Sequence, residues 1–237
     1  MSSEPVIEFK NVWKKYRVRE IFHGSIRDDI ARIFKRRKSR ELDMGEFWAL
    51  NDVCLSAARG ECVGLFGPNG SGKTTILKII ASVTYPTLGT VSVRGNVAPL
   101  IALGSGFHPD LTGMENIYVN GTILGMTLRE VKRKIGDIVE FSELADFIDM
   151  PVKKYSSGMH LKLGFAIAYH SSAGILLMDE ILAVADAAFT AKCMDGIRRL
   201  RDAGRTIIFV THNRALMDGV ADRVVYLKKG EISPAGL

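Results

Sequence analysis

Residues 67–74 have the sequence Gly-Pro-Asn-Gly-Ser-Gly-Lys-Thr, which matches G-x-x-x-x-G-K-[ST], the pattern of a phosphate-binding loop. The apolar run 61–66 before this loop predicts a buried strand, and residues 75–80 after it predict the first turns of a helix. In such a unit, glycines let backbone N–H groups and the positive end of the helix point at an anion. A loop that merely caps a helix is the alternative, and all four fixed positions in this context argue against it.

Each part of this loop has a predicted task. Lys73 would place a positive charge at the β- and γ-phosphates of a nucleotide, and the Thr74 hydroxyl would ligate Mg²⁺. The residues predicted to contact the nucleotide here are Gly67, Pro68, Asn69, Gly70, Ser71, Gly72, Lys73, Thr74 and Thr75.

The composition bounds the class of protein. The chain has 237 residues, of which 47% are hydrophobic, enough for one large domain or two small ones. No stretch approaches the roughly 18 consecutive apolar residues of a membrane span, and the first residues lack a secretion signal. We therefore expect a cytosolic chain whose membrane role would depend on a partner. Cys54, Cys62 and Cys193 have no metal-type spacing and are expected to be free buried thiols.

The net charge of +6 is concentrated in one segment. Residues 27–40 hold seven basic and two acidic side chains, a balance of +5. A general nucleic-acid binder spreads its basic charge over a face, so this segment favours a local contact, such as one with anionic lipid headgroups. A solvated loop is the open alternative. Before the basic residues 35–38, Ile26, Ile30, Ile33 and Phe34 recur at helical spacing and predict a short amphipathic helix.

The remaining pattern predicts an α/β core interrupted by a helical segment. The unbroken apolar runs 175–178 and 206–210 are typical of parallel strands covered on both faces. Residues 113–170 have apolar positions at helical intervals. Further elements are predicted as strands at 6–13, 48–53, 91–93 and 224–227 and a helix at about 186–203.

Two motifs beyond the loop carry chemistry. Asp179 and Glu180 end an apolar strand, where Asp179 would hold Mg²⁺ and Glu180 would accept a proton from the water that attacks the γ-phosphate. Their alternative role is to cap the next helix. The segment Ser156-Ser157-Gly158 precedes a helix that we expect to begin near His160. Small residues there leave N–H groups open to an anion, although an ordinary serine cap fits the pattern equally.

Three single residues are more ambiguous. Asp186 is either a functional carboxylate or only the cap of the helix that follows it. His212 follows the predicted strand 206–210 after one residue, Thr211, and ligands of open α/β sheets bind beyond the carboxyl ends of the strands. Tyr16 lies three residues beyond the predicted strand 6–13 and could be a core tyrosine at a strand end.

The order of these motifs resembles that of ATP-binding cassette (ABC) ATPases over nearly the whole chain. The resemblance implies an α/β P-loop NTPase fold of the ABC type, with a mixed sheet core and a helical subdomain. It also implies ATP and Mg²⁺ as ligands, and a homodimer in which Ser156, Ser157 and Gly158 complete the nucleotide site of the opposite subunit. Asp186 would lie at the subunit contact, His212 would be the switch histidine, and Tyr16 would stack on adenine.

The implied organisation is a single domain, residues 1–237. Its nucleotide-binding core would comprise about 1–100 and 171–237, its helical subdomain about 110–170, and its inserted basic helix 20–45.

A finer resemblance is to the subunits that power export of cell-surface polysaccharides such as O-antigen, capsule and teichoic acid. The segments 47–50, 103–118, 155–159 and 179–184 carry it. It implies a separate membrane subunit, expected in two copies, that moves a lipid-linked polysaccharide. It also implies a peripheral position on the cytoplasmic face of the inner membrane and no nucleic-acid partner. Export of another substrate, an ABC ATPase that acts on nucleic acid or ribosomes, and a small-molecule kinase are the alternatives.

The chain departs from the family pattern in several places. It contains no glutamine, so the usual Mg²⁺-sensing residue is absent and Leu103 or a neighbour stands about there. Ser157 replaces the usual glycine and Met159 the usual glutamine of the signature segment, and Ala185 stands where glycine is common.

Overall fold

The structure is a computed structural model that describes residues 4–17, 41–100, 106–179, 186–211 and 213–233. The expected amphipathic helix around residues 26–34 therefore lies outside the described residues. So do Leu103, Glu180, Ala185 and His212.

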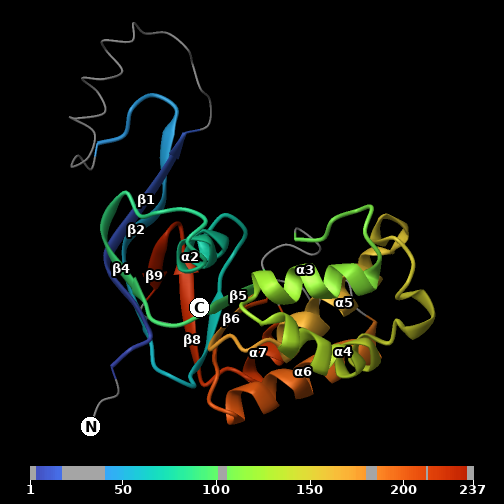
Figure 1. The fold of residues 1–237 in the computed structure, drawn as a ribbon. Coiled ribbons are helices and arrows are strands. Elements are labelled where there is room, and N and C mark those ends of the chain that lie inside the picture. The colour runs from blue at the N-terminus through green and yellow to red at the C-terminus, as the bar shows by residue number, and fades with distance from the viewer. Residues whose placement is uncertain (1–3, 18–40, 101–105, 180–185, 212, 234–237) are drawn as a thin grey trace, which may run out of the picture.

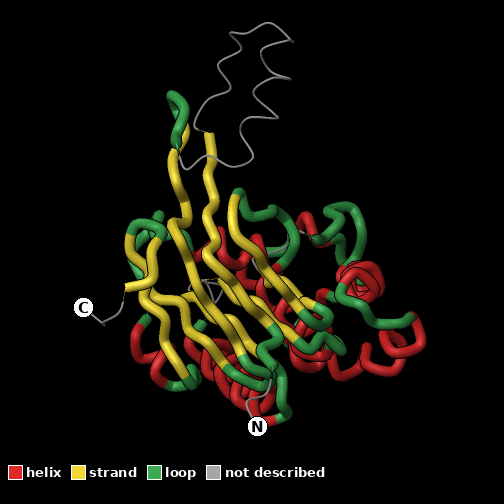
Figure 2. Tube along the Cα trace, turned by 90° about the vertical axis from the view of Figure 1, so that its left-hand side faces the viewer, coloured by secondary structure: helices red, strands yellow, loops and turns green. Residues whose placement is uncertain are grey.

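Two β-sheets form the core of the fold (Figure 1). The larger sheet has the order β5-β6-β7-β3-β8-β9, in which only β9 runs antiparallel to its neighbour. The smaller sheet is antiparallel, with the order β2-β1-β4, and the paired ends of β1 and β2 extend beyond the other strands (Figure 2). The strands are β1 (Ile7–Arg17), β2 (Glu46–Ala57), β3 (Cys62–Phe66), β4 (Leu88–Val93), β5 (Val97–Leu100), β6 (Ile175–Asp179), β7 (Thr206–Val210), β8 (Arg223–Lys228) and β9 (Glu231–Ser233).

The unbroken apolar strands lie between two hydrophobic clusters, as their composition predicts. Along β6, Ile175 and Leu177 pack into the cluster between the two sheets, whereas Leu176 and Met178 pack into the cluster on the opposite face. Because side chains alternate between the faces of a strand, a strand covered on both sides must be apolar at every position.

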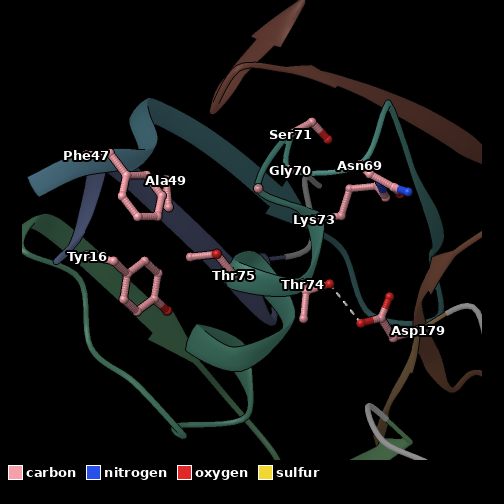
Figure 3. Close-up of a pocket in the computed structure, with 11 residues that line it drawn as sticks. Tyr16, Phe47, Ala49, Asn69, Gly70, Ser71, Lys73, Thr74, Thr75 and Asp179 are labelled. Carbon is pink, nitrogen blue, oxygen red and sulfur yellow. Dashed lines mark hydrogen bonds between the residues drawn. The ribbon is translucent and has the colours of Figure 1, made fainter. Parts of the chain in front are cut away.

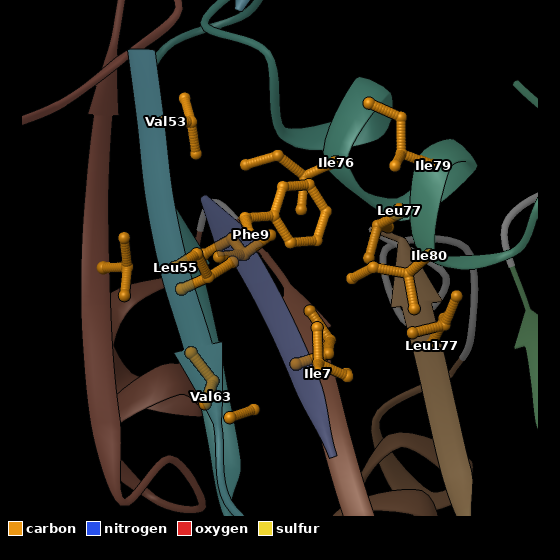
Figure 4. Close-up of a cluster of buried hydrophobic side chains, with 14 of the residues drawn as sticks. Ile7, Phe9, Val53, Leu55, Val63, Ile76, Leu77, Ile79, Ile80 and Leu177 are labelled. Carbon is orange, nitrogen blue, oxygen red and sulfur yellow. The ribbon is translucent and has the colours of Figure 1, made fainter. Parts of the chain in front are cut away.

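Helix α2 (Lys73–Ile80) fills the space between the two sheets (Figure 4). Its Ile76 and Leu77 are fully buried, next to Ile7 and Phe9 of the smaller sheet and Leu177 of the larger one. Because α2 is packed on both sides, its N-terminus and the loop before it have a fixed direction.

The other helices lie beyond the opposite face of the larger sheet (Figure 1). Helices α3 and α4 begin with capping boxes, Thr112 with Glu115 and Thr127 with Glu130. The helices are α3 (Gly113–Ile123), α4 (Leu128–Ser142), α5 (Ser157–His170), α6 (Ala187–Asp202) and α7 (Arg214–Asp218), with 3₁₀ turns η1 (Ala145–Phe147) and η2 (Val152–Lys154).

Helix α5 belongs to two hydrophobic clusters. Its Leu161 and Phe165 pack with the larger sheet and α6, whereas its Leu163 and Ile167 pack with α3 and α4. The helix begins at Ser157, not near His160 as predicted, because the Ser156 side chain accepts a hydrogen bond from the backbone of Met159.

The thiols differ from one another. Cys62 and Cys193 are buried, and burial raises the pKa of each to about 12, so both stay protonated and unreactive at neutral pH. Cys54 is exposed, so the prediction of three buried thiols was wrong for this residue, which lies on a strand of the smaller sheet.

Within the described ranges, no helix has both the length and the hydropathy to cross a bilayer.

We predict that Leu177→Ala lowers the free energy of unfolding by about 2–5 kcal/mol, because it opens a cavity between β6 and α2. Urea denaturation measures this loss. Leu128→Ala is the control, since Leu128 is 61% exposed and its truncation should change stability by about 0.5 kcal/mol or less. Equal losses for the two variants would contradict the assignment of the core.

Candidate functional site

The loop 67–72 joins β3 to α2, and its backbone passes close to neighbouring strands. A Cβ at Gly67 would lie 2.1 Å from the backbone oxygen of Leu227, and one at Gly72 would lie 2.7 Å from that of Ala49. Gly72 also has a φ of 107°, which favours glycine. In contrast, a Cβ at Gly70 would have nothing within 4 Å. The loop is therefore tightly held at both ends and open at its middle.

Lys73 is the first residue of α2 and is buried, with 5% of its surface exposed. Its ammonium donates hydrogen bonds to the backbone oxygens of Gly67 at 2.8 Å and Pro68 at 3.0 Å. The hydroxyl of Ser71 is also buried and has no hydrogen-bond partner among the described residues. A buried cation beside an unsatisfied hydroxyl, at the positive end of a helix, fits an anionic group such as a phosphate.

The residues predicted to hold Mg²⁺ come together. The hydroxyl of Thr74, on α2, donates a hydrogen bond of 2.9 Å to the carboxylate of Asp179 at the end of β6 (Figure 3). Mg²⁺ in nucleotide sites is commonly bound through one or two carboxylates together with the phosphates of the substrate. A hydroxyl and a carboxylate oxygen this close, beside the phosphate-binding loop, fit such an ion.

An aromatic pair stands beside the loop. Tyr16 of β1 and Phe47 of β2 are partners in the strand register, and their ring centroids lie 6.1 Å apart at an interplanar angle of 35°. The Lys14 ammonium lies 5.0 Å from the Tyr16 ring centroid. Aromatic faces of this kind bind planar heterocycles by stacking. Tyr16 therefore lies beside the phosphate loop, and its stacking on adenine stays a prediction.

A pocket of about 510 Å³ unites these features (Figure 3). Two of its residues, Phe47 and Ala49, were missed as site residues, although they are alternate residues of β2 and so lie on one face of that strand. Gly67 and Pro68 do not line it and act instead by holding Lys73. The lining residues are Tyr16, Phe47, Ala49, Asn69, Gly70, Ser71, Gly72, Lys73, Thr74, Thr75 and Asp179.

The signature segment lies outside this pocket. Ser156 caps α5, and both Ser156 and Ser157 are exposed at the start of that helix beside Gly158. A cap satisfies only one of the N–H groups that a helix start leaves unpaired, so this helix start can still bind an anion. The role of these residues toward an opposite subunit stays a prediction.

Asp186 caps α6, as its structural interpretation predicts. Its carboxylate accepts a hydrogen bond of 2.7 Å from the backbone of Phe189 and lies 3.4 Å from the ammonium of Lys162. The Phe189 N–H, helped by Lys162, lowers the pKa of Asp186. The carboxylate is therefore ionised at neutral pH. Its place at a subunit contact stays a prediction.

Glu180 and His212 were predicted to act on the γ-phosphate, and both lie outside the described residues. Their described neighbours are informative. Asp179, which precedes Glu180, pairs with Val210 in the register of β6 and β7. The chain therefore leaves both strands at the same edge of the sheet, the edge that carries Thr74 and the pocket.

The chain is similar to proteins of a known family. A profile of the family described as "ABC transporter" matches residues 50–183, more than half of the chain. The O-antigen export system ATP-binding protein RfbB of Klebsiella pneumoniae is 43% identical over 98% of this chain and 94% of its own length. The chain belongs to the ABC transporter family. The resemblance inferred from the motifs is thereby confirmed, and with it the prediction of an ATPase.

A second relative and a solved structure are also similar to this chain. The teichoic acids export ATP-binding protein TagH of Lactiplantibacillus plantarum is 39% identical over 100% of this chain and 63% of its own length. A solved post-hydrolysis dimer of an ATP-binding cassette, bound to ADP and Pi, superposes with a TM-score of 0.77 at 23% identity, over 98% of this chain and 100% of that chain. This likeness confirms the predicted fold class, an ABC-type α/β P-loop NTPase.

We predict that Phe47→Ala weakens binding of an adenine nucleotide about tenfold, because loss of one stacking aromatic typically removes about 1–3 kcal/mol. Titration of a fluorescent ATP analogue measures the affinity. Phe147→Ala is a matched control, since Phe147 is 47% exposed, close to the 45% of Phe47, and does not line the pocket. Unchanged affinity in Phe47→Ala would remove this residue from the site.

Proposed function

We propose that this chain is the ATP-binding and ATP-hydrolysing subunit that powers export of a lipid-linked cell-surface polysaccharide through a separate membrane subunit. The observation that carries the proposal is the pocket that joins a phosphate loop, an aromatic pair and the Thr74–Asp179 pair. The names of the relatives that match nearly the whole chain, an O-antigen and a teichoic-acid exporter, support the substrate class.

In this proposal the pocket binds ATP from adenine to γ-phosphate. Tyr16 and Phe47 contact the base, and the backbone of the loop 69–72 receives the phosphates. Lys73 neutralises charge at the β- and γ-phosphates. The buried position of Lys73 strengthens this interaction, because water screens a buried charge poorly.

Thr74 and Asp179 are the residues that would hold Mg²⁺. Held by these two side chains, the ion would supply positive charge against the charge that develops during phosphoryl transfer. The hydrogen bond from Thr74 to Asp179 already fixes both side chains at the edge of the pocket. They therefore need little rearrangement to become ligands.

Hydrolysis needs a base and a second copy of the chain. Glu180 follows Asp179 directly and is proposed to accept the proton of the attacking water, with His212 as the switch residue that senses the γ-phosphate. Ser156, Ser157 and Gly158 of one copy would contact the nucleotide held by Lys73 of the other, and Asp186 would line the contact between the copies. Loss of the γ-phosphate then removes contacts from both sides and opens the dimer.

The proposed working position is the cytoplasmic face of the inner membrane, where a homodimer would drive two copies of a membrane subunit. The proposed internal division is a nucleotide-binding core at about 1–100 and 171–237, a helical subdomain at about 110–170 and a basic insertion at 20–45. The resemblance of residues 47–50, 103–118, 155–159 and 179–184 to polysaccharide exporters favours this class over export of another substrate. The concentration of basic charge in one short run counts against a role on nucleic acid.

We predict that Glu180→Gln keeps ATP affinity and lowers kcat by about 10²–10⁴-fold, the usual contribution of a general base. The same variant should accumulate as an ATP-dependent dimer in size-exclusion chromatography, because ATP that is not hydrolysed keeps the two copies together. Lys73→Ala should instead lose ATP binding. A Glu180→Gln chain that hydrolyses ATP at the wild-type rate would remove Glu180 from this role.

The substrate class needs a test in cells. In a strain that lacks the chromosomal gene, we expect the wild-type chain to restore a surface polysaccharide and Lys73→Ala to fail at equal abundance. Accumulation of lipid-linked glycan inside the cell would identify export as the blocked step. Normal surface glycan in the strain without the gene would contradict the substrate class and leave the ATPase assignment intact.

A further inference from the structure

A cluster of charged side chains joins three helices away from the pocket. Glu143 caps the C-terminus of α4 with a left-handed φ of 59°. Its carboxylate accepts hydrogen bonds from the ammonium of Lys162 on α5 at 2.7 Å and from that of Lys192 on α6 at 3.1 Å. One carboxylate therefore ties α4 to both of the helices that begin near predicted subunit contacts.

Lys162 makes a second ionic contact that Lys192 does not share. Its ammonium lies 3.4 Å from the carboxylate of Asp186 and 4.9 Å from the ring centroid of Phe189. The backbone N–H of Phe189 in turn donates to Asp186. Lys162 thus bridges the end of α4 and the first residues of α6. The Lys162 side chain is 20% exposed, whereas those of Glu143 and Asp186 are 45% and 57% exposed, so solvent partly screens these contacts.

The position of Lys162 on α5 connects this bridge to the signature segment at the start of the same helix. Lys162 lies four residues after Gly158, and residues at that spacing share one face of a helix. Its ammonium therefore connects the helix that carries Ser156–Gly158 to Asp186, which caps α6. These are the two parts of the chain that contact the opposite subunit in the proposed function.

Lys192 shares one partner with Lys162 but otherwise makes different contacts. Its ammonium binds Glu143 and the backbone oxygen of Phe141, at 2.9 Å for the latter, and lies 4.8 Å from the Phe141 ring. Among the described residues, the structure records no contact of Lys192 with Asp186. The two lysines therefore share one carboxylate partner, but only Lys162 connects that partner to Asp186.

We infer that Lys162 is a positioning residue for ATP hydrolysis, which holds Asp186 and the start of α6 in register with the signature segment at the start of α5. This inference rests on the proposed function, because it presumes a dimer in which both parts meet the partner. Without the bridge, the two parts lose their mutual register when the dimer closes. Nucleotide binding by the same chain is unaffected, because Lys162 does not line the pocket.

Lys162→Met tests the inference, because it removes the charge and keeps an unbranched apolar side chain over Phe189. We expect an unchanged ATP affinity and a kcat lowered about tenfold or more, within the loss of about 10²-fold that a 1 Å misplacement can cause. In a Glu180→Gln background, the same change should reduce the fraction of ATP-dependent dimer. Lys162→Arg should recover most of both, since it restores a cation in reach of the two carboxylates.

Lys192→Met is the matched control, and we expect it to keep the wild-type kcat and dimer fraction. Asp186→Asn is the second variant, because asparagine caps helices as well as aspartate does and lacks the charge that Lys162 binds. Its loss of kcat should match that of Lys162→Met, and the double variant should lose no more than either single one. Thermal unfolding of every variant separates these effects from misfolding.

Three outcomes would overturn the inference. A Lys162→Met chain with wild-type kcat and dimerisation would do so. Additive losses in the Lys162→Met, Asp186→Asn double variant would do so too, since the two residues would then act separately. Equal losses in Lys162→Met and Lys192→Met would assign the effect to general packing of α4. A wild-type chain that neither binds nor hydrolyses ATP would overturn the proposed function itself, which distinguishes the two failures.

Discussion

The burial of α2 between two sheets is the constraint on which the site depends. Ile76 and Leu77 on this helix are fully buried among side chains of both sheets, so the helix cannot turn without opening the core. Its fixed N-terminus gives the phosphate loop a direction, and Lys73, its first residue, is locked by the backbone oxygens of Gly67 and Pro68. A binding site is more accurate when rigid elements carry it, because little freedom remains to be lost on binding.

The parts of the fold that the sequence predicted well are those whose signals are local. The loop motif, the apolar strands β6 and β7 and the helix α6 each follow from a few consecutive residues. The meeting of Thr74 with Asp179, 105 residues away, was also predictable. Both residues follow from one rule, because parallel strands end at the same edge of a sheet and ligands bind there.

The parts that the sequence could not predict depend on pairing between distant segments. Phe47 lies in the pocket because β1 and β2 pair with Tyr16 opposite Phe47, and a one-residue slip would turn that ring to the other face. Strand β9 has only three residues and β5 contains a proline, so neither carries a clear periodic signal. The start of α5 was misplaced because a single side-chain hydrogen bond, from Met159 to Ser156, decides it.

The structural and functional interpretations of Ser156 and Asp186 do not exclude each other. Each caps a helix by accepting one hydrogen bond, from the backbone N–H of Met159 or Phe189, and so each fixes where a positive helix end begins. A helix start leaves four N–H groups without intrahelical partners, and a cap satisfies only one or two of them. The cap therefore prepares the helix start for an anion by holding the remaining N–H groups in place. Because α5 packs against both the sheet and α4, a displacement of α5 in one hydrophobic cluster must also shift its side chains in the other cluster. A residue that ties α5 to α6 can therefore couple two helix starts that share no direct contact with the pocket of their own chain.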